Sequence, residues 1–434
     1  MLKKIKLFYK KNVLLKVASF NSLSVFVKLV SGFVLSKAIA YFLFPQGMAL
    51  TGNLRSFLVS CQGISVSGAQ NGLIKYTAEN KNNDIVLKEI ISTSFFLMVA
   101  FTILISLVLI GFSDYFSVLV FGVKDYVYAI KILAYVIPLY AINTFVLAII
   151  NGLGKYKTII LINTIGYIVN VVVVVFLLYF YNLEGAIIAM ITMPSVLIFI
   201  TFFWIKEIKM IFTNISISSF SKKYLNGLSS FIVMAIFTAL TIPIVHVVVK
   251  NYIITNVGLK YAGYWEAMIK ISQYYLMFIM SLFSLYLLPK LSQNQTDEGF
   301  KRLIIQFYKT ILPLVLLVFI AIYFFRYWVI RITLTQEFLP TQELFFWQLI
   351  GDFFKIASFA IAYQMQAKKM LLWYLFGELF YVSIVYFFSI YFIDKFEVKG
   401  AVIAHAISYL SYFLLMLFIF RKSLLTKINA KIEK

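Results

Sequence analysis

Charged residues are scarce in this chain, and acidic ones are the scarcest. Of its 434 residues only 13% are charged, and 17 aspartates and glutamates stand against 39 lysines and arginines. Soluble domains carry about 25% charged residues, so the composition excludes an ordinary soluble globular protein. Because 62% of the residues are hydrophobic, the sequence predicts a membrane protein that crosses the bilayer many times.

Residues of the kind that build metal or catalytic sites are also few. The single cysteine, Cys61, excludes an intrachain disulfide and a cysteine-based metal site. The two histidines, His246 and His405, do not suffice for a metal site, and we expect them to be hydrogen-bonded packing residues near outer helix ends. We find no phosphate-cradling glycine loop, no ATP-binding segment and no nucleophile constellation. The sequence therefore predicts no cofactor, no metal and no catalytic residue, and a transporter that uses an ion gradient or mass action.

Long apolar stretches fill most of the chain. A membrane-spanning helix needs about 20 apolar residues, because each residue rises about 1.5 Å and the hydrocarbon core is about 30 Å thick. We predict an all-α fold of twelve such helices. Their predicted ranges are 15–43, 53–76, 88–112, 127–150, 158–181, 185–205, 228–250, 262–288, 303–325, 340–366, 370–392 and 400–420.

The loops carry their lysines and arginines mostly on one side of this map. By the positive-inside rule that side is cytoplasmic, and both termini belong to it. The basic start MLKKIKLFYKKN is predicted to be a cytoplasmic tail before an uncleaved first helix. The net charge of +22 thus reflects membrane orientation, and no nucleic-acid partner is expected.

The longest cytoplasmic connection, about 206–227, divides the chain into two halves. We predict one six-helix bundle over 1–213 and a second over 214–434. Arg55 and Lys75 map onto Lys270 and Lys290 with one offset of 215 positions. Because six spans is an even number, both bundles run in the same direction, as parallel repeats around a central cavity.

The first two spans contain basic residues that a lipid-facing helix would not tolerate. Lys28 lies near the middle of the first span and shares a polar stripe with Ser24 and Ser31. Lys37 and Arg55 lie nearer the outer boundary, where either a cavity position or snorkelling to the interface is possible. The polar stripe around Lys28 therefore predicts that this face of the first span lines a water-filled cavity.

Later spans contain charges at spacings that allow pairing. Glu266 and Lys270 are four residues apart, Asp352 and Lys355 three, and no basic residue lies three or four positions from Glu378. Each charge inside lipid would cost about 2.5–3.5 kcal/mol on insertion scales, so an interior cavity or structural ion pairing must accommodate them.

Basic residues still outnumber acidic ones within the spans, which suits an anionic substrate such as a pyrophosphate. The predicted substrate-binding residues are Lys28, Lys37, Arg55, Lys270 and Lys355. The predicted ion-coupling residues are Glu378, Asp352 and Glu266.

Segments 27–40, 52–79, 263–292 and 345–369, with their NG-x-x-KY and YLLP-x-LS patterns, resemble a known family. They are similar to the O-antigen translocases and the enterobacterial common antigen lipid flippases. These belong to the multidrug/oligosaccharidyl-lipid/polysaccharide exporter superfamily, and the resemblance covers essentially the whole chain.

The resemblance implies a flippase that moves an undecaprenyl-pyrophosphate-linked oligosaccharide across the bacterial inner membrane. It implies membrane lipids, H⁺ or Na⁺, and polysaccharide polymerase machinery as partners. Residues matching Lys28, Lys37 and Arg55 would line the cavity, and Asp352 with Lys355 (in GD-x-x-K) and Glu378 also fit. Uncharged residues would be expected in near relatives at Glu266 and Lys270.

Three other functions compete with this one. A drug or metabolite antiporter of the same superfamily would favour an acidic or apolar cavity. A polysaccharide polymerase or glycosyltransferase would need a long external loop, and the longest here, near 113–126, 251–261 and 326–339, are short. A non-transporting scaffold would have little use for Lys28.

Overall fold

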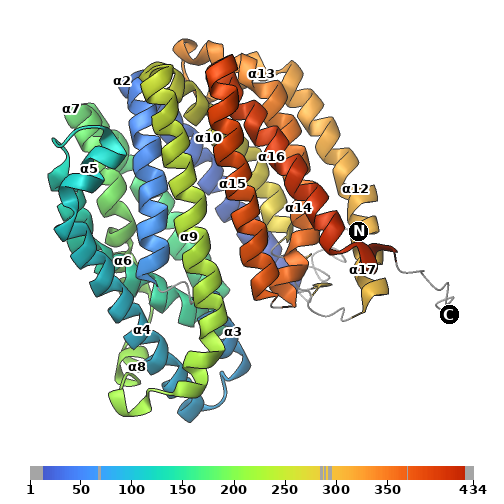
Figure 1. Cartoon of the computed structure of the whole chain (residues 1–434). Coiled ribbons are helices and arrows are strands. Elements are labelled where there is room, and N and C mark those ends of the chain that lie inside the picture. Colours follow the sequence, from blue (N-terminus) through green and yellow to red (C-terminus); the bar gives the residue numbers. More distant parts are fainter. Residues whose placement is uncertain are drawn as a thin grey trace, which may run out of the picture. The chain divides into compact units, whose positions relative to one another are not determined.

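A computed structural model of the chain describes residues 13–66, 70–283, 287, 290–291, 296–368 and 370–425. These residues form helices and no strand (Figure 1). Both predicted cytoplasmic ends and the last part of the predicted span 262–288 extend outside the described residues. The protein is a multi-pass membrane protein, since nine helices within the described part are long and apolar enough to cross a bilayer.

The helices follow one another with short connections. The first group comprises α2 (Val13–Ser65), α3 (Gln70–Glu79), α4 (Asp84–Gly111), α5 (Ser113–Phe121), α6 (Val127–Gly152), α7 (Tyr156–Trp204), α8 (Ile208–Thr213), η1 (Ile217–Ser219) and α9 (Lys222–Asn256). The second comprises α10 (Leu259–Leu282), α12 (Asp297–Phe324), α13 (Arg326–Thr333), η3 (Gln336–Leu344), α14 (Phe345–Ala367), α15 (Leu371–Phe396), α16 (Val398–Ile419) and α17 (Arg421–Leu425).

The chain divides into two compact units. Unit 1 contains the described part of Met1–Phe42 together with Asn53–Pro243, and unit 2 contains Leu43–Gly52 and Ile244–Lys434 as far as it is described. The short segment Leu43–Gly52 of α2 therefore packs in unit 2, and α9 passes from one unit into the other at Pro243. The predicted bundles 1–213 and 214–434 remain a prediction about the repeat.

Each unit has its own packed interior. In unit 1, α4, α6 and α7 pack around buried residues such as Leu109, Ile130 and Ile149. In unit 2, α16 packs along both α14 and α15, as Figure 1 shows. This three-helix packing positions most of the site described below.

Two pairs of predicted spans join through a single residue rather than a loop. In α2 the helix breaks at Phe44 (φ 57°, ψ −172°) and resumes at Pro45, and in α7 it breaks at Asn182 (φ 47°, ψ −125°). Proline suits a first helical position, because its φ is already fixed and its missing N–H would be unsatisfied there anyway. The expected connections 44–52 and 182–184 are therefore largely helical, and the count of twelve spans stays a prediction.

A repeated turn supports the parallel repeat. Glu397 between α15 and α16 has φ 52° and ψ −139°, close to the values of Asn182. Three residues later, a Cβ on Gly185 would lie 2.0 Å from Leu177 O, and one on Gly400 would lie 2.1 Å from Phe392 O. Asn182 and Glu397 are 215 positions apart, and so are Gly185 and Gly400. This is the same offset that relates Arg55 to Lys270 in the sequence. The two halves thus share a tight helix–helix turn at the same place.

Candidate functional site

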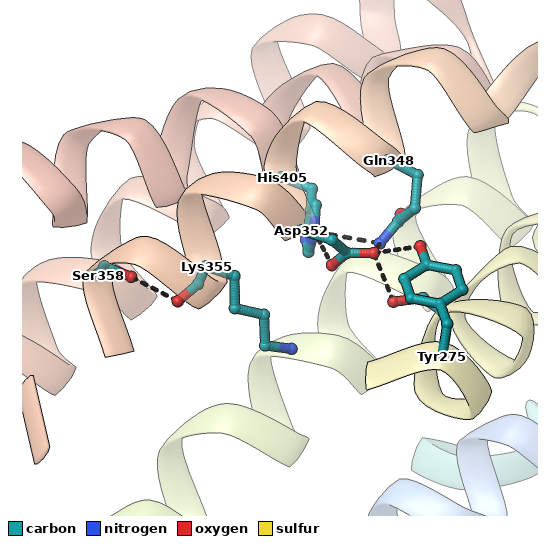
Figure 2. Close-up of polar contacts among 7 residues, drawn as sticks. Tyr275, Gln348, Asp352, Lys355, Ser358 and His405 are labelled. Atoms are coloured by element: carbon teal, nitrogen blue, oxygen red, sulfur yellow. Dashed lines mark hydrogen bonds and ion pairs between the residues drawn. The ribbon is translucent and has the colours of Figure 1, made fainter. Parts of the chain in front are cut away.

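The centre of unit 2 contains a fully buried carboxylate. Asp352 of α14 is 0% exposed. Its Oδ2 accepts hydrogen bonds from Ser272 Oγ at 2.6 Å, Gln348 Nε2 at 3.2 Å and the Tyr275 hydroxyl. Its Oδ1 lies 3.0 Å from His405 Nε2 (Figure 2). Side chains from α10, α14 and α16 thus satisfy both oxygens, as burial of a charge requires.

A glycine allows this close approach. Gly351 precedes Asp352, and a Cβ there would lie 2.2 Å from His405 Cδ2 and 3.0 Å from Ala406 Cα. Without a side chain at this point, α16 can pack close enough to α14 for the imidazole to reach the carboxylate. The GD dipeptide therefore supplies both the contact and the acid.

A cavity of about 80 Å³ lies beside this network. A water molecule occupies about 30 Å³ in the liquid, so the cavity has room for a few waters. Both histidines of the chain line it, with Gln348, Lys355 and Tyr409 among the other lining residues. His405 lies within hydrogen-bond distance of Asp352, which fits the expectation of a hydrogen-bonded packing residue, although the sequence did not indicate which group it contacts.

The described part of the chain shows no salt bridge between Lys355 and Asp352, although their spacing allowed one. Among the described residues, the nitrogen of a basic side chain that lies closest to Asp352 is Nε2 of His405, at hydrogen-bond distance from Oδ1. The Lys355 ammonium lies 5.3 Å from the Tyr409 ring centroid and 5.9 Å from that of Phe359, a cation–π arrangement on the cavity wall. Residues three apart on a helix differ by about 60° in direction around the helix axis. This difference is enough to direct the side chains of Asp352 and Lys355 to different partners.

A second buried pair lies between α9 and α10. Lys250 Nζ lies 2.6 Å from Glu266 Oε2, and the two side chains are 1% and 4% exposed. The lysine also lies 5.9 Å from the Trp265 ring, which stacks on His246. The spacing in the sequence allowed Glu266 to pair with Lys270, and it did not indicate Lys250 of another helix as a partner.

The remaining predicted residues divide between the units. Lys270 is buried and Glu378 half-buried, both in unit 2. Lys28 and Lys37 are exposed in unit 1, and Arg55 is half-buried there. The Lys28 ammonium lies 6.0 Å from the Tyr167 ring, while Ser24 on the same stripe contacts Thr164 of α7.

Sequence reasoning missed Tyr275, Ser272, Lys250 and the contact of His405. Spacing along one helix identifies partners only within that helix, and these contacts join different helices. One signal was present: polar residues of α10 and α14 recur on one face each, which indicates that these faces meet other polar groups.

The fold defines the class of protein. An inward-facing multidrug resistance transporter of the MATE family, in the MOP superfamily, has a TM-score of 0.72 and 16% identity, covering 92% of this chain and 95% of that one. The inward closed conformation of the lipid II flippase MurJ has a TM-score of 0.66 and 16% identity, covering 95% and 90%. The chain therefore has the fold of MATE transporters and MurJ.

The sequence then identifies the family. Residues 64–343 match the family described as "Polysaccharide biosynthesis protein", and this is more than half of the chain. The chain belongs to that family. Similar relatives include the lipid III flippases of Escherichia coli (strain K12) and Shigella flexneri, each 26% identical over 400 residues, which is 92% of this chain and 96% of theirs.

Proposed function

We propose that this protein is a flippase for an undecaprenyl-pyrophosphate-linked oligosaccharide, which it moves from the inner to the outer leaflet of the bacterial inner membrane. The observation that carries the proposal is its similarity to lipid III flippases over 92% of its length, within a polysaccharide biosynthesis family. Under this proposal the chain acts as a transporter, not as an enzyme.

The charges of both units support an anionic cargo. Lys28, Lys37 and Arg55 belong to unit 1, and Lys270 and Lys355 to unit 2. Lysine and arginine are the residues that bind phosphate groups, and those in membrane spans commonly mark a substrate path. We propose that these five residues bind the pyrophosphate and its sugars.

A drug antiporter of the same superfamily is the second candidate, because the MATE transporters share the fold. In unit 2 the acids Asp352 and Glu266 are already bound to a histidine and a lysine. Acids that already have buried partners suit a cationic drug poorly, and the basic residues favour the anionic lipid.

The proposal includes an orientation and further partners. Both termini would be cytoplasmic, as the lysine bias predicts, with H⁺ or Na⁺ as the coupling ion. Glu378, Asp352 and Glu266 are the proposed coupling residues. Polysaccharide polymerase machinery would receive the exported glycan.

Reconstituted protein tests the proposal. Proteoliposomes would carry a fluorescent undecaprenyl-pyrophosphate-linked oligosaccharide in both leaflets, and a membrane-impermeant quencher would be added outside. We expect about half of the label to be quenched in protein-free vesicles and nearly all of it in vesicles with protein, because flipping exposes the inner-leaflet pool. A cationic dye in the same vesicles serves as the second substrate. Transport of the dye without flipping of the lipid would contradict the proposal and favour the antiporter.

A further inference from the structure

An exposed apolar groove runs between α12 and α14 of unit 2. It encloses about 330 Å³ and is lined by Phe319, Ile320, Tyr323, Phe346 and Phe353, among other apolar residues. Ligand sites in proteins usually have volumes of about 300–1,000 Å³. On a membrane-spanning surface, a groove of this size and chemistry suits a hydrocarbon chain.

A polar pocket adjoins this groove. A second cavity of about 550 Å³ shares Tyr323 and Phe346 with the groove and adds Arg326, Glu343 and Lys399. The Arg326 guanidinium lies 4.4 Å from the Tyr323 ring centroid, and its Nη1 donates to Tyr323 O at 2.7 Å. The arginine is therefore held at the junction between the apolar and the polar parts.

The charge of the polar pocket is small and positive. Lys399 Nζ lies 3.8 Å from a Glu343 carboxylate oxygen, so this pair is balanced and Arg326 contributes the excess. A net charge of one matches a phosphodiester, which carries one negative charge, better than a pyrophosphate, which carries more. Exposed Trp328 on the adjoining α13 is typical of a helix at the membrane–water interface, the depth of lipid headgroups.

The internal repeat provides a comparison within the molecule. A corresponding groove of about 290 Å³ lies between α4 and α6 in unit 1. The positions 215 residues before Arg326 and Lys399 are Gly111 and Glu184. Neither counterpart is basic, so the charges of Arg326 and Lys399 do not follow from the fold. The counterpart of Phe346 is Lys131, which is not among the residues that line the groove of unit 1.

We propose that the α12–α14 groove binds a singly charged anionic phospholipid, with one acyl chain in the groove and the phosphate beside Arg326 and Lys399. Basic pockets between transmembrane helices, described for the matrix or cytoplasmic side, bind anionic lipid headgroups, and the same charge complementarity applies here. With segment 326–339 outside, as the lysine bias predicts, the site faces the outer leaflet. It is separate from the residues assigned to the flipped substrate.

Native mass spectrometry of the full-length protein, with phosphatidylglycerol or phosphatidylcholine added, tests the site. We expect the wild type to retain phosphatidylglycerol in preference. Since a basic residue near a membrane contributes about 1 kcal/mol, Arg326→Gln or Lys399→Gln should weaken phosphatidylglycerol binding about fivefold each. Neither change should alter binding of phosphatidylcholine. Ile320→Trp fills the groove and should weaken binding of both lipids.

Two variants in unit 1 serve as matched controls. Lys124→Gln removes an exposed lysine that pairs with Asp114 at 3.4 Å, and Ile103→Trp fills the α4–α6 groove. Both should bind lipid as the wild type does. Arg326→Lys, which keeps the charge, should retain the preference and shows that a loss in Arg326→Gln is not misfolding.

Three results would overturn the proposal. The wild type could retain both lipids equally, or the double variant Arg326→Gln/Lys399→Gln could keep its preference; either would mean that the groove holds bulk lipid only. Undecaprenyl pyrophosphate could instead displace phosphatidylglycerol from the wild type and bind about fivefold more weakly to Arg326→Gln. The groove would then belong to the carrier lipid. None of these results bears on whether the protein flips a glycan lipid.

Discussion

At the scale of single residues, Lys28 combines exposure with a fixed neighbour. Its ammonium lies 6.0 Å from the Tyr167 ring, and the half-buried Tyr167 belongs to α7 of the same unit. A cation over an aromatic face gains about 0.5–2 kcal/mol while it stays available to an anion on its other side. This arrangement would keep the charge in place before the substrate arrives.

Removing that charge should abolish glycan export. Lys28→Ala is expected to leave no detectable surface polysaccharide in a strain that lacks the wild-type gene, while its level in the membrane stays normal. Lys28→Arg should restore part of the export, because it keeps the charge. The measurement is surface glycan per unit of membrane protein. Full export by Lys28→Ala would remove Lys28 from the binding site.

Gly52 packs directly against the Glu266 carboxylate of the buried Lys250–Glu266 pair. A Cβ on Gly52 would lie 2.4 Å from Glu266 Oε2 and 2.3 Å from its Cδ. Gly52→Ala should therefore displace the carboxylate and lower the free energy of unfolding by about 3–5 kcal/mol, the usual cost of breaking a buried pair. Thermal unfolding in detergent measures the effect.

The same substitution in a protein without the buried pair shows whether the clash with Glu266 causes the loss of stability. In a protein that carries Lys250→Met and Glu266→Ala, Gly52→Ala should cost little, because the clashing carboxylate is gone. An equal loss of stability in both backgrounds would mean that Gly52 serves only the packing of helix backbones.

At the scale of helices, the repeated turn makes its own prediction. Gly400→Ala and Gly185→Ala each place a methyl group within about 2 Å of a backbone oxygen, which cannot move independently of its helix. Each should lower the free energy of unfolding by roughly 1–3 kcal/mol. Gly111→Ala is the control, since nothing lies within 4 Å of its added Cβ and alanine favours helix. Thermal unfolding that left Gly400→Ala as stable as Gly111→Ala would show that this turn can relax.

The helices also show how much of the fold the sequence can predict. Apolar length places α4, α6 and α12 within a few residues, and the offset of 215 predicts the parallel repeat. The breaks at Phe44 and Asn182 were less predictable, because at each of them a single residue with positive φ interrupts the helix where the sequence predicted a connection between two spans. Asp352 and Glu266 stand out as charges in apolar spans, yet their partners His405 and Lys250 come from other helices. Only packing, not spacing within a helix, determines those contacts.

At the scale of the whole molecule, the proposed transport cycle needs a proton carrier that water can reach. Asp352 is 0% exposed and receives hydrogen bonds from Ser272, Tyr275 and Gln348. The Glu266 side chain is buried and paired with Lys250. Glu378 on α15 is half-buried, so of the three acids it is the one open to a changing environment. Of the three proposed coupling residues, we therefore propose Glu378 as the one that carries the proton, with Asp352 contributing mainly to the structure.

This assignment predicts different defects for two conservative changes. Glu378→Gln should flip substrate at a rate that no longer responds to an imposed pH gradient, because the amide cannot carry a proton. Asp352→Asn should keep its response to the gradient but lose stability, roughly 1–3 kcal/mol, because its amide group would face the donors that now bind the carboxylate.

Flux and thermal unfolding are measured on the same proteoliposome preparations, with sodium replaced by potassium to separate the two candidate ions. If flux through Glu378→Gln follows the pH gradient as in the wild type, Glu378 is not the carrier. Flux that instead requires sodium in both variants would assign coupling to that ion, for which a protonatable glutamate is not needed.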